Sequence, residues 1–173
     1  MTQSTLTQKT WLKPFSCALI LATSQLAHAQ TCKTDSIIAT TPDSRFTPIG
    51  NGSEVKDTVT GLIWQRCSIG QTWNGNTCAG TATTHTWQQA LTVAKNLGNG
   101  YRLPNIKELA SIVEEQCYDP AINSKTFPNT PSSYYWCSSP NAYYYNYAWG
   151  VNFNNGYGNY NFKNNSYYVR AVR

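Results

Sequence analysis

The segment from Asn141 to Tyr168, named the Tyr/Asn tract below, contains 9 Asn and 8 Tyr among its 28 residues. Tyrosine provides a large, rigid contact area with only two side-chain torsions to order, and asparagine provides adaptable hydrogen-bond donors and acceptors. Antibody-type binding surfaces use the same pair of residue types. The tract therefore predicts a ligand-binding surface. A disordered low-complexity tail and a set of core tyrosines are the alternative interpretations.

An apolar skeleton runs through the tract and just beyond it, formed by Ala148, Trp149, Val151, Phe153 and Val169. These residues alternate at strand spacing, and Asn154-Asn155-Gly156 is a hairpin signal between two such runs. We therefore expect Trp149 and Phe153 in the core. The side chains expected to project outward and bind the ligand are Tyr143, Tyr144, Tyr145, Asn146, Asn154, Tyr157, Asn159, Tyr160, Asn161, Lys163 and Asn165.

Catalytic chemistry has little support in the sequence. The 8 acidic residues are scattered, without the paired carboxylates of glycosidases. After residue 29 there is a single histidine, His85, and the sequence gives no pattern typical of a Ser-His-Asp catalytic triad. His85 reads as a loop residue and Glu108 as a helix-capping residue. We therefore expect a non-enzymatic protein with no catalytic residues and no cofactor, and a hydrolase or redox enzyme is an alternative.

The first 29 residues have the pattern of a secretory signal peptide. Lys9 and Lys13 precede an apolar run over residues 15–26, and Ala27-His28-Ala29 is a small-x-small cleavage signal. Neither this run nor any later stretch reaches the roughly 20 apolar residues that span a bilayer. We therefore expect an exported protein, in the periplasm or outside the cell, with no transmembrane segment once the signal is removed.

Removal of the signal leaves 11 basic and 8 acidic residues, a net charge of +3. This charge is too small to indicate nucleic acid as a partner. It permits weak attraction to acidic or sulfated glycans, and it also fits a solvated surface with no electrostatic role.

The cysteines that follow the signal are Cys32, Cys67, Cys78, Cys117 and Cys137. In an exported protein they predict a disulfide framework with one thiol left over. Cys67 and Cys78 enclose a short, flexible loop, whose closure stabilises a fold by about 3 kcal/mol. We predict Cys67–Cys78 and Cys32–Cys117 bridges with Cys137 free, and a Cys117–Cys137 bridge is the alternative. Because the chain after residue 29 has one histidine and no Cys-x-x-Cys pair, no metal site is expected.

Two helices with clear start signals are expected in the middle of the chain. Thr86 and Gln89 have the spacing of a capping box, and Gly98 supplies a left-handed stop. The buried face of this helix is expected to comprise Trp87, Ala90, Leu91, Ala94 and Leu97. Asn105 and Glu108 repeat the capping box before a second helix. Its buried stripe is expected to comprise Ile106, Leu109, Ile112 and Val113.

The remaining chain divides into a lead-in and a main domain. Residues 30–59 read as an ordered but loop-rich lead-in, and residues 60–173 as the domain itself, beginning with a strand candidate at 62–66. After the helices the pattern is β, with strands expected at 134–136, 147–153, 157–162 and 167–173. A helix pair followed by an antiparallel sheet indicates an α+β fold.

Five segments of the chain share their motifs with one family. They are residues 60–64 (Thr-Gly-Leu-Ile-Trp), Trp87 with Ala90, residues 101–109 (Tyr-Arg-Leu-Pro-Asn-Ile-Lys-Glu-Leu), Tyr135-Trp136 with Ser138-Ser139, and residues 168–173 (Tyr-Val-Arg-Ala-Val-Arg). In combination they resemble the Lcl C-terminal domain, a bacterial domain found at the end of a collagen-like adhesin and catalogued as a domain of unknown function. The resemblance covers residues 40–173.

The Arg-Leu-Pro motif and the C-terminal strand also resemble the formylglycine-generating enzyme fold. This resemblance implies a C-type-lectin-like architecture, with two helices packed on twisted antiparallel β-sheets. The calcium loop of lectins, Glu-Pro-Asn or Gln-Pro-Asp, is not matched by Leu103-Pro104-Asn105, which stands at a helix start. The copper-binding cysteine pair of the formylglycine enzymes has no clear counterpart. Neither calcium-dependent sugar binding nor that enzymatic activity is therefore implied.

The Tyr/Asn tract also resembles the variable proteins of diversity-generating retroelements, which use this lectin-like fold. Reverse transcription in those systems changes template adenines, so that an AAC codon for Asn becomes a codon for Tyr, Ser, Gly, Asp or Phe. Residues whose codons lack adenine, such as Trp149, Val151, Phe153 and Gly156, would keep the scaffold intact. Cys137 would differ from a serine codon by one such change.

The sequence therefore predicts an exported, non-enzymatic recognition domain that binds a protein or glycan ligand at the cell surface through the Tyr/Asn tract. A structural or assembly domain of envelope machinery is an alternative, because it would share every feature of the fold and differ only in its partner. The identity of the ligand, the oligomeric state and the choice between periplasm and exterior stay open at this point.

Overall fold

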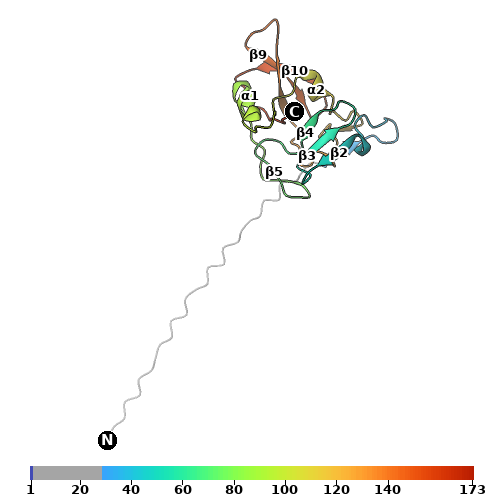
Figure 1. The fold of residues 1–173 in the computed structure, drawn as a ribbon, viewed down its shortest axis with the longest axis vertical. Helices are drawn as coiled ribbons and strands as arrows, with labels where there is room; N and C mark the ends of the chain where they lie inside the picture. The colour runs from blue at the N-terminus through green and yellow to red at the C-terminus, as the bar shows by residue number, and fades with distance from the viewer. Residues whose placement is uncertain (2–28) are drawn as a thin grey trace.

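The computed structural model describes Met1 and residues 29–173, and Figure 1 shows their arrangement. The expected signal peptide lies almost entirely outside the described residues. Among the residues that are described, no helix has the length and apolar character needed to cross a membrane. The described residues form short antiparallel sheets and two α-helices, which indicates an α+β fold.

A three-stranded antiparallel sheet is built from the first half of the chain. It follows a short 3-10 helix and has the order β2-β3-β4: η1 (Asp43–Arg45), β2 (Phe46–Ile49), β3 (Glu54–Asp57) and β4 (Ile63–Gln65). β3 pairs with β4 across the expected boundary at residue 60, so the lead-in joins the same sheet as the domain. Phe46, Val55 and Trp64 are buried in the main core.

The second half of the chain forms the sheet that carries the Tyr/Asn tract, in the order β8-β9-β10. Its strands and the two helices that cover it are β8 (Tyr134–Pro140), β9 (Tyr147–Asn152), β10 (Gly158–Phe162), α1 (Trp87–Lys95) and α2 (Ile106–Ala110). The two helices pack on opposite faces, because Tyr135 belongs to the core cluster beneath α2 and the adjacent Trp136 to the cluster beneath α1. Figure 1 shows α1 and α2 on either side of this sheet.

Both helices begin at the predicted capping boxes. Thr86 Oγ1 accepts a bond from Gln89 N, and the Gln89 side chain accepts one from Thr86 N. Asn105 and Glu108 make the same reciprocal bonds, at 2.9 and 2.8 Å. Each pair satisfies N–H groups that the start of a helix leaves open. The predicted starts of both helices are confirmed.

The helix ends differ from the predicted apolar stripes. α1 ends at Lys95, and Leu97 is exposed because the chain has left the helix before it, so its predicted place on the buried face is wrong. α2 has only 5 residues and is capped by Ser111, whose hydroxyl donates to a carbonyl of the last turn. Ile112 and Val113 are buried as predicted, but they follow the helix rather than forming its stripe.

The two predicted disulfides are present, and each includes at least one cysteine from a pair of short strands. These pairs are β1 (Thr31–Cys32) with β7 (Cys117–Tyr118), and β5 (Thr72–Trp73) with β6 (Cys78–Ala79). Cys32–Cys117 joins the first pair directly, and Cys67–Cys78 anchors the second. Cys137 is free, as predicted. It is also buried, and burial raises the pKa of its thiol to about 11.

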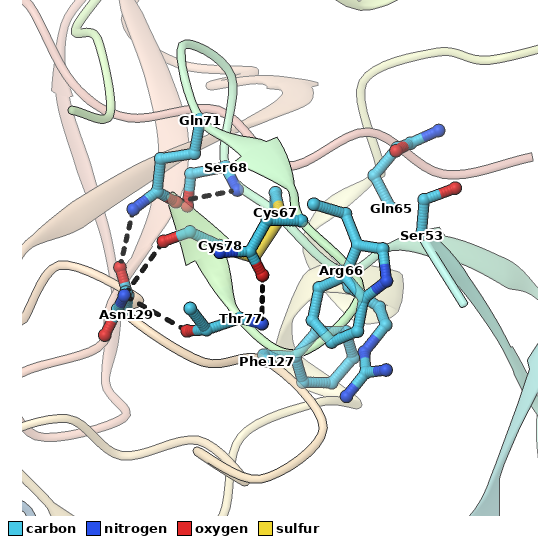
Figure 2. The surroundings of a disulfide bond; sticks show 12 residues. Ser53, Gln65, Arg66, Cys67, Ser68, Gln71, Thr77, Cys78, Phe127 and Asn129 are labelled. Atoms are coloured by element: carbon cyan, nitrogen blue, oxygen red, sulfur yellow. Dashed lines mark hydrogen bonds between the residues drawn. A yellow bond between two sulfur atoms is a disulfide. The ribbon is translucent and has the colours of Figure 1, made fainter. Parts of the chain in front are cut away.

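The Cys67–Cys78 bridge is fixed to a distant segment by Asn129, as Figure 2 shows. Asn129 Nδ2 donates to Cys78 O at 2.8 Å and to Thr77 Oγ1 at 3.2 Å. Gln71 Nε2 donates in return to Asn129 O at 3.0 Å. The disulfide loop is thereby held against the segment that leads into β8.

The C-terminal segment is not the continuous strand predicted for residues 167–173. It makes isolated bridges instead: Tyr167 with His85, Tyr168 with Tyr135, and Val172 with both Trp64 and Arg102. Since the bridges go to different parts of the fold, the segment does not stay in register with one partner strand. It joins the two halves of the domain.

Arg170 lies at the centre of this segment and is fully buried. Its guanidinium donates to Gln65 O at 3.0 Å, to Thr130 Oγ1 at 2.7 Å and to Arg66 O. The charge lies 4.7 Å from the centroid of the Phe127 ring, and no carboxylate in the described part of the chain pairs with it. Burial lowers the pKa of Arg170, but a guanidinium stays protonated in proteins.

Replacing Arg170 with Ala should destabilise the fold by about 3 kcal/mol, because the change leaves buried acceptors without a donor and opens a cavity. Unfolding in urea measures the effect. Lys56→Ala, at an exposed position of β3, is the control and should stay within about 0.5 kcal/mol of the wild type. Equal unfolding midpoints for the two variants would contradict this role of Arg170.

Candidate functional site

The β9–β10 hairpin places aromatic side chains of the Tyr/Asn tract on one face of its sheet. Directly opposed residues in an antiparallel pair project to the same side, and here Trp149 opposes Tyr160 while Tyr147 opposes Phe162. Two more rings come from the loop before β9: Tyr144 packs on this face, and Tyr143 packs on Tyr144. We name the set the aromatic surface, and it comprises Tyr143, Tyr144, Tyr147, Trp149, Tyr160 and Phe162.

The rings of the aromatic surface pack on one another in an unbroken series. The ring centroid of Tyr147 lies 4.1 Å from that of Phe162 and 5.6 Å from that of Tyr160. The Tyr160 centroid lies 5.3 Å from Trp149 and 6.1 Å from Tyr144. The pairs are tilted or edge-to-face, arrangements that stabilise by about 0.5–1.5 kcal/mol per pair. The rings therefore hold one another in place.

The outer rings of the aromatic surface are open to solvent, and the inner ones are anchored. Tyr143 is 85% exposed, Phe162 49% and Tyr144 46%. Trp149 is partly buried because it packs against the main core. A ligand can therefore contact the outer rings without disturbing the core.

The aromatic surface carries little charge. Lys163 is the single charged residue of the Tyr/Asn tract. Its Nζ donates to Tyr145 O at 2.6 Å and lies 4.4 Å from the centroid of the Trp87 ring. Since this ammonium group is already engaged, the surface offers a ligand mainly apolar area and neutral hydrogen-bonding groups.

Several asparagines of the tract bond to neighbouring backbone groups. Asn141 Oδ1 accepts bonds from the N–H groups of Tyr143 and Tyr144, both at 2.9 Å. Asn159 Oδ1 accepts one from Tyr160 N at 2.8 Å. Such local bonds from side chain to backbone are the reason that asparagine is common in turns. These amides position the rings, and their oxygens are already occupied.

The predicted ligand-binding residues divide into three groups in space. Tyr143, Tyr144 and Tyr160 belong to the aromatic surface, and Tyr145 and Asn146 are exposed in the same loop. This first group is the one that the structure brings together.

The second group lies at the far end of the hairpin, at the turn between β9 and β10. Tyr157 is exposed there. Asn154 Nδ2 donates to Asp119 Oδ1 and to Ser132 Oγ, each at 3.3 Å. This group lies before the first residue of β10, whereas Phe162 of the aromatic surface is the last residue of that strand.

The third group lies on the other face of the sheet. Asn159 and Asn161 alternate with Tyr160 along β10, so their side chains project away from the aromatic surface. Asn161 Oδ1 accepts a bond from the Tyr167 hydroxyl, and Asn165 Nδ2 donates to the same hydroxyl, both at 3.1 Å. Lys163, already paired, adjoins this group through Trp87 and α1.

Three members of the aromatic surface were not among the predicted ligand-binding residues. Tyr147 and Phe162 were not chosen, although strand alternation places them with Trp149 and Tyr160 and would have identified them. Trp149 was expected in the core, and it packs on the core while staying partly exposed. Phe153 is fully buried, as expected.

The candidate catalytic side chains have structural contacts instead. Within residues 29–173, no group of three or more His, Cys, Asp or Glu could hold a metal ion. His85 Nε2 is hydrogen-bonded to Thr83 Oγ1 at 2.9 Å, and burial lowers the pKa of the imidazole. Glu108 caps α2 and pairs with Arg102 at 2.7 Å, a bond that lowers the pKa of the carboxyl group.

Comparison with protein-family models matches residues 53–173 to the Lcl C-terminal domain. The match covers more than two thirds of the chain and includes both helices, the aromatic surface and the C-terminal segment. No curated protein matches the chain.

Truncating the outermost rings should leave the fold almost unchanged. Tyr145→Ala, at a position 87% exposed, should alter the free energy of unfolding by no more than about 0.5 kcal/mol. Tyr143→Ala, at a position 85% exposed, should cost no more than about 1 kcal/mol, because its ring packs on that of Tyr144. Phe153→Ala should cost about 3–5 kcal/mol, because its ring is fully buried. Thermal unfolding of the three variants tests the distinction. Tyrosine variants that melt as early as the phenylalanine variant would show that the tract is core.

Proposed function

The chain belongs to the Lcl C-terminal domain family, and we propose that it is an exported, non-enzymatic recognition domain. Its ligand is a protein or a glycan at the cell surface, and the aromatic surface is the binding site. The observation that carries the proposal is the exposure of mutually packed aromatic rings on one face of the β9–β10 hairpin.

The physical chemistry of the aromatic surface supports ligand binding. Tyr and Trp are enriched among the residues that dominate interface energies, where truncation of a central side chain costs about 2 kcal/mol or more. A neutral aromatic face can also stack on the apolar faces of sugar rings. Because the rings are already positioned by one another and by Asn141, binding orders few additional torsions.

A C-type-lectin-like architecture is part of the proposal. It is supported by two helices that pack on opposite faces of an antiparallel sheet. The C-terminal end also returns to β4, where Ile63 and Arg173 exchange backbone bonds at 2.9 Å. Binding residues are commonly carried by loops and edges that a rigid scaffold positions, and the aromatic surface occupies such a place.

The proposed location is the periplasm or the cell exterior. Disulfides persist in oxidising compartments and are rare in the cytosol. The Cys32–Cys117 and Cys67–Cys78 bridges therefore support export.

Removing the centre of the aromatic surface should weaken binding without unfolding the domain. The double variant Tyr144→Ala/Tyr160→Ala should lower affinity at least about 30-fold, as expected for the loss of central aromatic side chains. Fluorescently labelled wild type and variant would be applied to two arrays, one carrying glycans and one carrying cell-surface proteins. The array that retains the wild type identifies the class of ligand.

Tyr118→Ala is the matched control for that experiment. Tyr118 is 47% exposed, against 46% for Tyr144, but it lies in β7 of another sheet. Its variant should bind as the wild type does. Binding that survives the double variant, or that the control variant loses to the same extent, would contradict the proposal.

We also propose that the Tyr/Asn tract is diversified in the manner of retroelement variable proteins. Positions expected to lack codon adenines have structural roles: Val151 and Phe153 are fully buried. Gly156 has a φ of +82°, and a side chain there would meet Val113. The exposed Tyr and Asn positions lie between such residues, so variation at them would leave the scaffold intact.

The DNA around the gene tests this second proposal. We expect a reverse-transcriptase gene nearby, together with a partial copy of the 3′ end of the gene that differs from it only at adenines. A genomic region without such a copy, or a copy that differs at other bases, would refute diversification while leaving the recognition function to be tested separately.

A further inference from the structure

β10 is the terminal strand of its sheet, and no strand among the described residues pairs with its outer edge. Four of its 5 residues are exposed, and it contains neither a proline nor a charged residue. Natural sheets usually protect such edges with charges, prolines or covering loops, because the edge offers unpaired N–H and C=O groups to another strand. β10 has none of these protections within its own sequence.

The outward-facing backbone groups of β10 follow from the pairing pattern with β9. The paired region is closed at its ends by backbone bonds of 2.9 Å, from Asn152 N to Tyr157 O and from Lys163 N to Asn146 O. Hydrogen-bonded and non-hydrogen-bonded residue pairs alternate along an antiparallel ladder. The backbone groups of Gly158, Tyr160 and Phe162 therefore point away from β9. Two of them have a partner in their own chain, since Tyr160 N donates to Asn159 Oδ1 and Phe162 O accepts from Asn165 N.

We propose that this edge pairs with β10 of a second copy of the chain, in an antiparallel register centred on Tyr160. Tyr160 then opposes Tyr160 of the second copy, and Gly158 opposes Phe162 of the second copy. In this register, each residue whose backbone N–H and C=O point away from β9 lies opposite another such residue. An aromatic ring opposite an edge glycine is a favourable cross-strand pair, because the ring covers backbone that glycine leaves bare.

The edge is complementary to itself, which is the reason to assign a second copy as its partner. β10 is uncharged, so two copies do not repel each other. The neighbouring Lys163 is bound to Tyr145 O of its own chain. The register also has two-fold symmetry, which is the common symmetry of homodimers.

Pairing of this kind changes the size of the aromatic surface. Opposed residues in an antiparallel pair project to the same side, so Tyr160 and Phe162 of both copies lie on one face of a six-stranded sheet. Each copy thus contributes rings to one continuous face. The pairing itself depends only on the β10 edge and not on the proposed ligand.

Two contacts within the chain oppose the pairing. Phe162 O already accepts a bond from Asn165 N at 2.9 Å, and the Gly158 N–H of the second copy needs the same carbonyl. Asn159 Oδ1 accepts the bond from Tyr160 N at 2.8 Å, and the second copy needs the same N–H group. Dimerisation must exchange these local bonds for backbone bonds between chains. We therefore expect a reversible dimer, and we expect Asn159 to weaken it.

Sedimentation velocity of the purified protein over a range of concentrations tests the inference. The wild type should show a monomer–dimer equilibrium. Tyr160→Pro removes the outward N–H without touching the ladder to β9, and should weaken dimerisation at least about tenfold. Tyr160→Ala removes the ring but keeps the N–H, and should weaken it less. Asn159→Ala removes the competing acceptor and should strengthen dimerisation by about threefold or more.

Amide hydrogen exchange of the wild type provides a readout that does not depend on how the proline variant folds. Protection of the Gly158 and Phe162 amides should rise with protein concentration, while protection of Asn161, which faces β9, should not change. A wild type that is monomeric at about 1 mM, or a dimer that Tyr160→Pro and Asn159→Ala leave unchanged, would overturn the inference.

Discussion

The burial of Arg170 is the constraint on which the arrangement of the whole domain depends. Taking a guanidinium out of water is costly unless acceptors surround it. Those acceptors come from three separate places: the end of β4, Ser68 beside the Cys67–Cys78 bridge, and Thr130 in the segment before β8. The C-terminal segment, the disulfide loop and the sheet that carries the Tyr/Asn tract must therefore meet at one point.

The same network extends from Arg170 to the base of the aromatic surface. The Tyr135 hydroxyl is hydrogen-bonded to Ser68 Oγ at 2.6 Å, and burial raises the pKa of Tyr135 to about 12, so the hydroxyl keeps its proton. The Tyr135 ring packs edge-to-face on Phe153, with centroids 5.0 Å apart, just beyond the end of β9. β8 and β9 are thereby tied to the buried guanidinium. The exposed rings on β9 and β10 therefore stand on strands that are fixed to the buried core.

The features predictable from the sequence are those set by a few neighbouring residues. The capping box of Asn105 and Glu108 specifies the start of α2. The hairpin signal Asn154-Asn155-Gly156 specifies the turn between β9 and β10. The path of the C-terminal segment was not predictable, because its bridges go to segments far away in the chain. The candidate site was predictable in part. Strand alternation predicts that Tyr160 is exposed. Whether the side-chain amide of Asn159 faces a ligand or bonds to the neighbouring backbone depends on its side-chain conformation, which alternation does not specify.

The open edge of β10 and the aromatic surface have one physical origin. Among the described residues no further strand pairs with β10, and four of its 5 residues are exposed. A protein selected for stability alone would cover or charge such a strand. Here stability comes from elsewhere, from two disulfides and from a buried core that includes Arg170 and Phe153. Because exposed substitutions cost little, the exposed residues on this hairpin can change while the scaffold stays the same. The proposed recognition through a variable surface requires such a separation of stability from the exposed side chains.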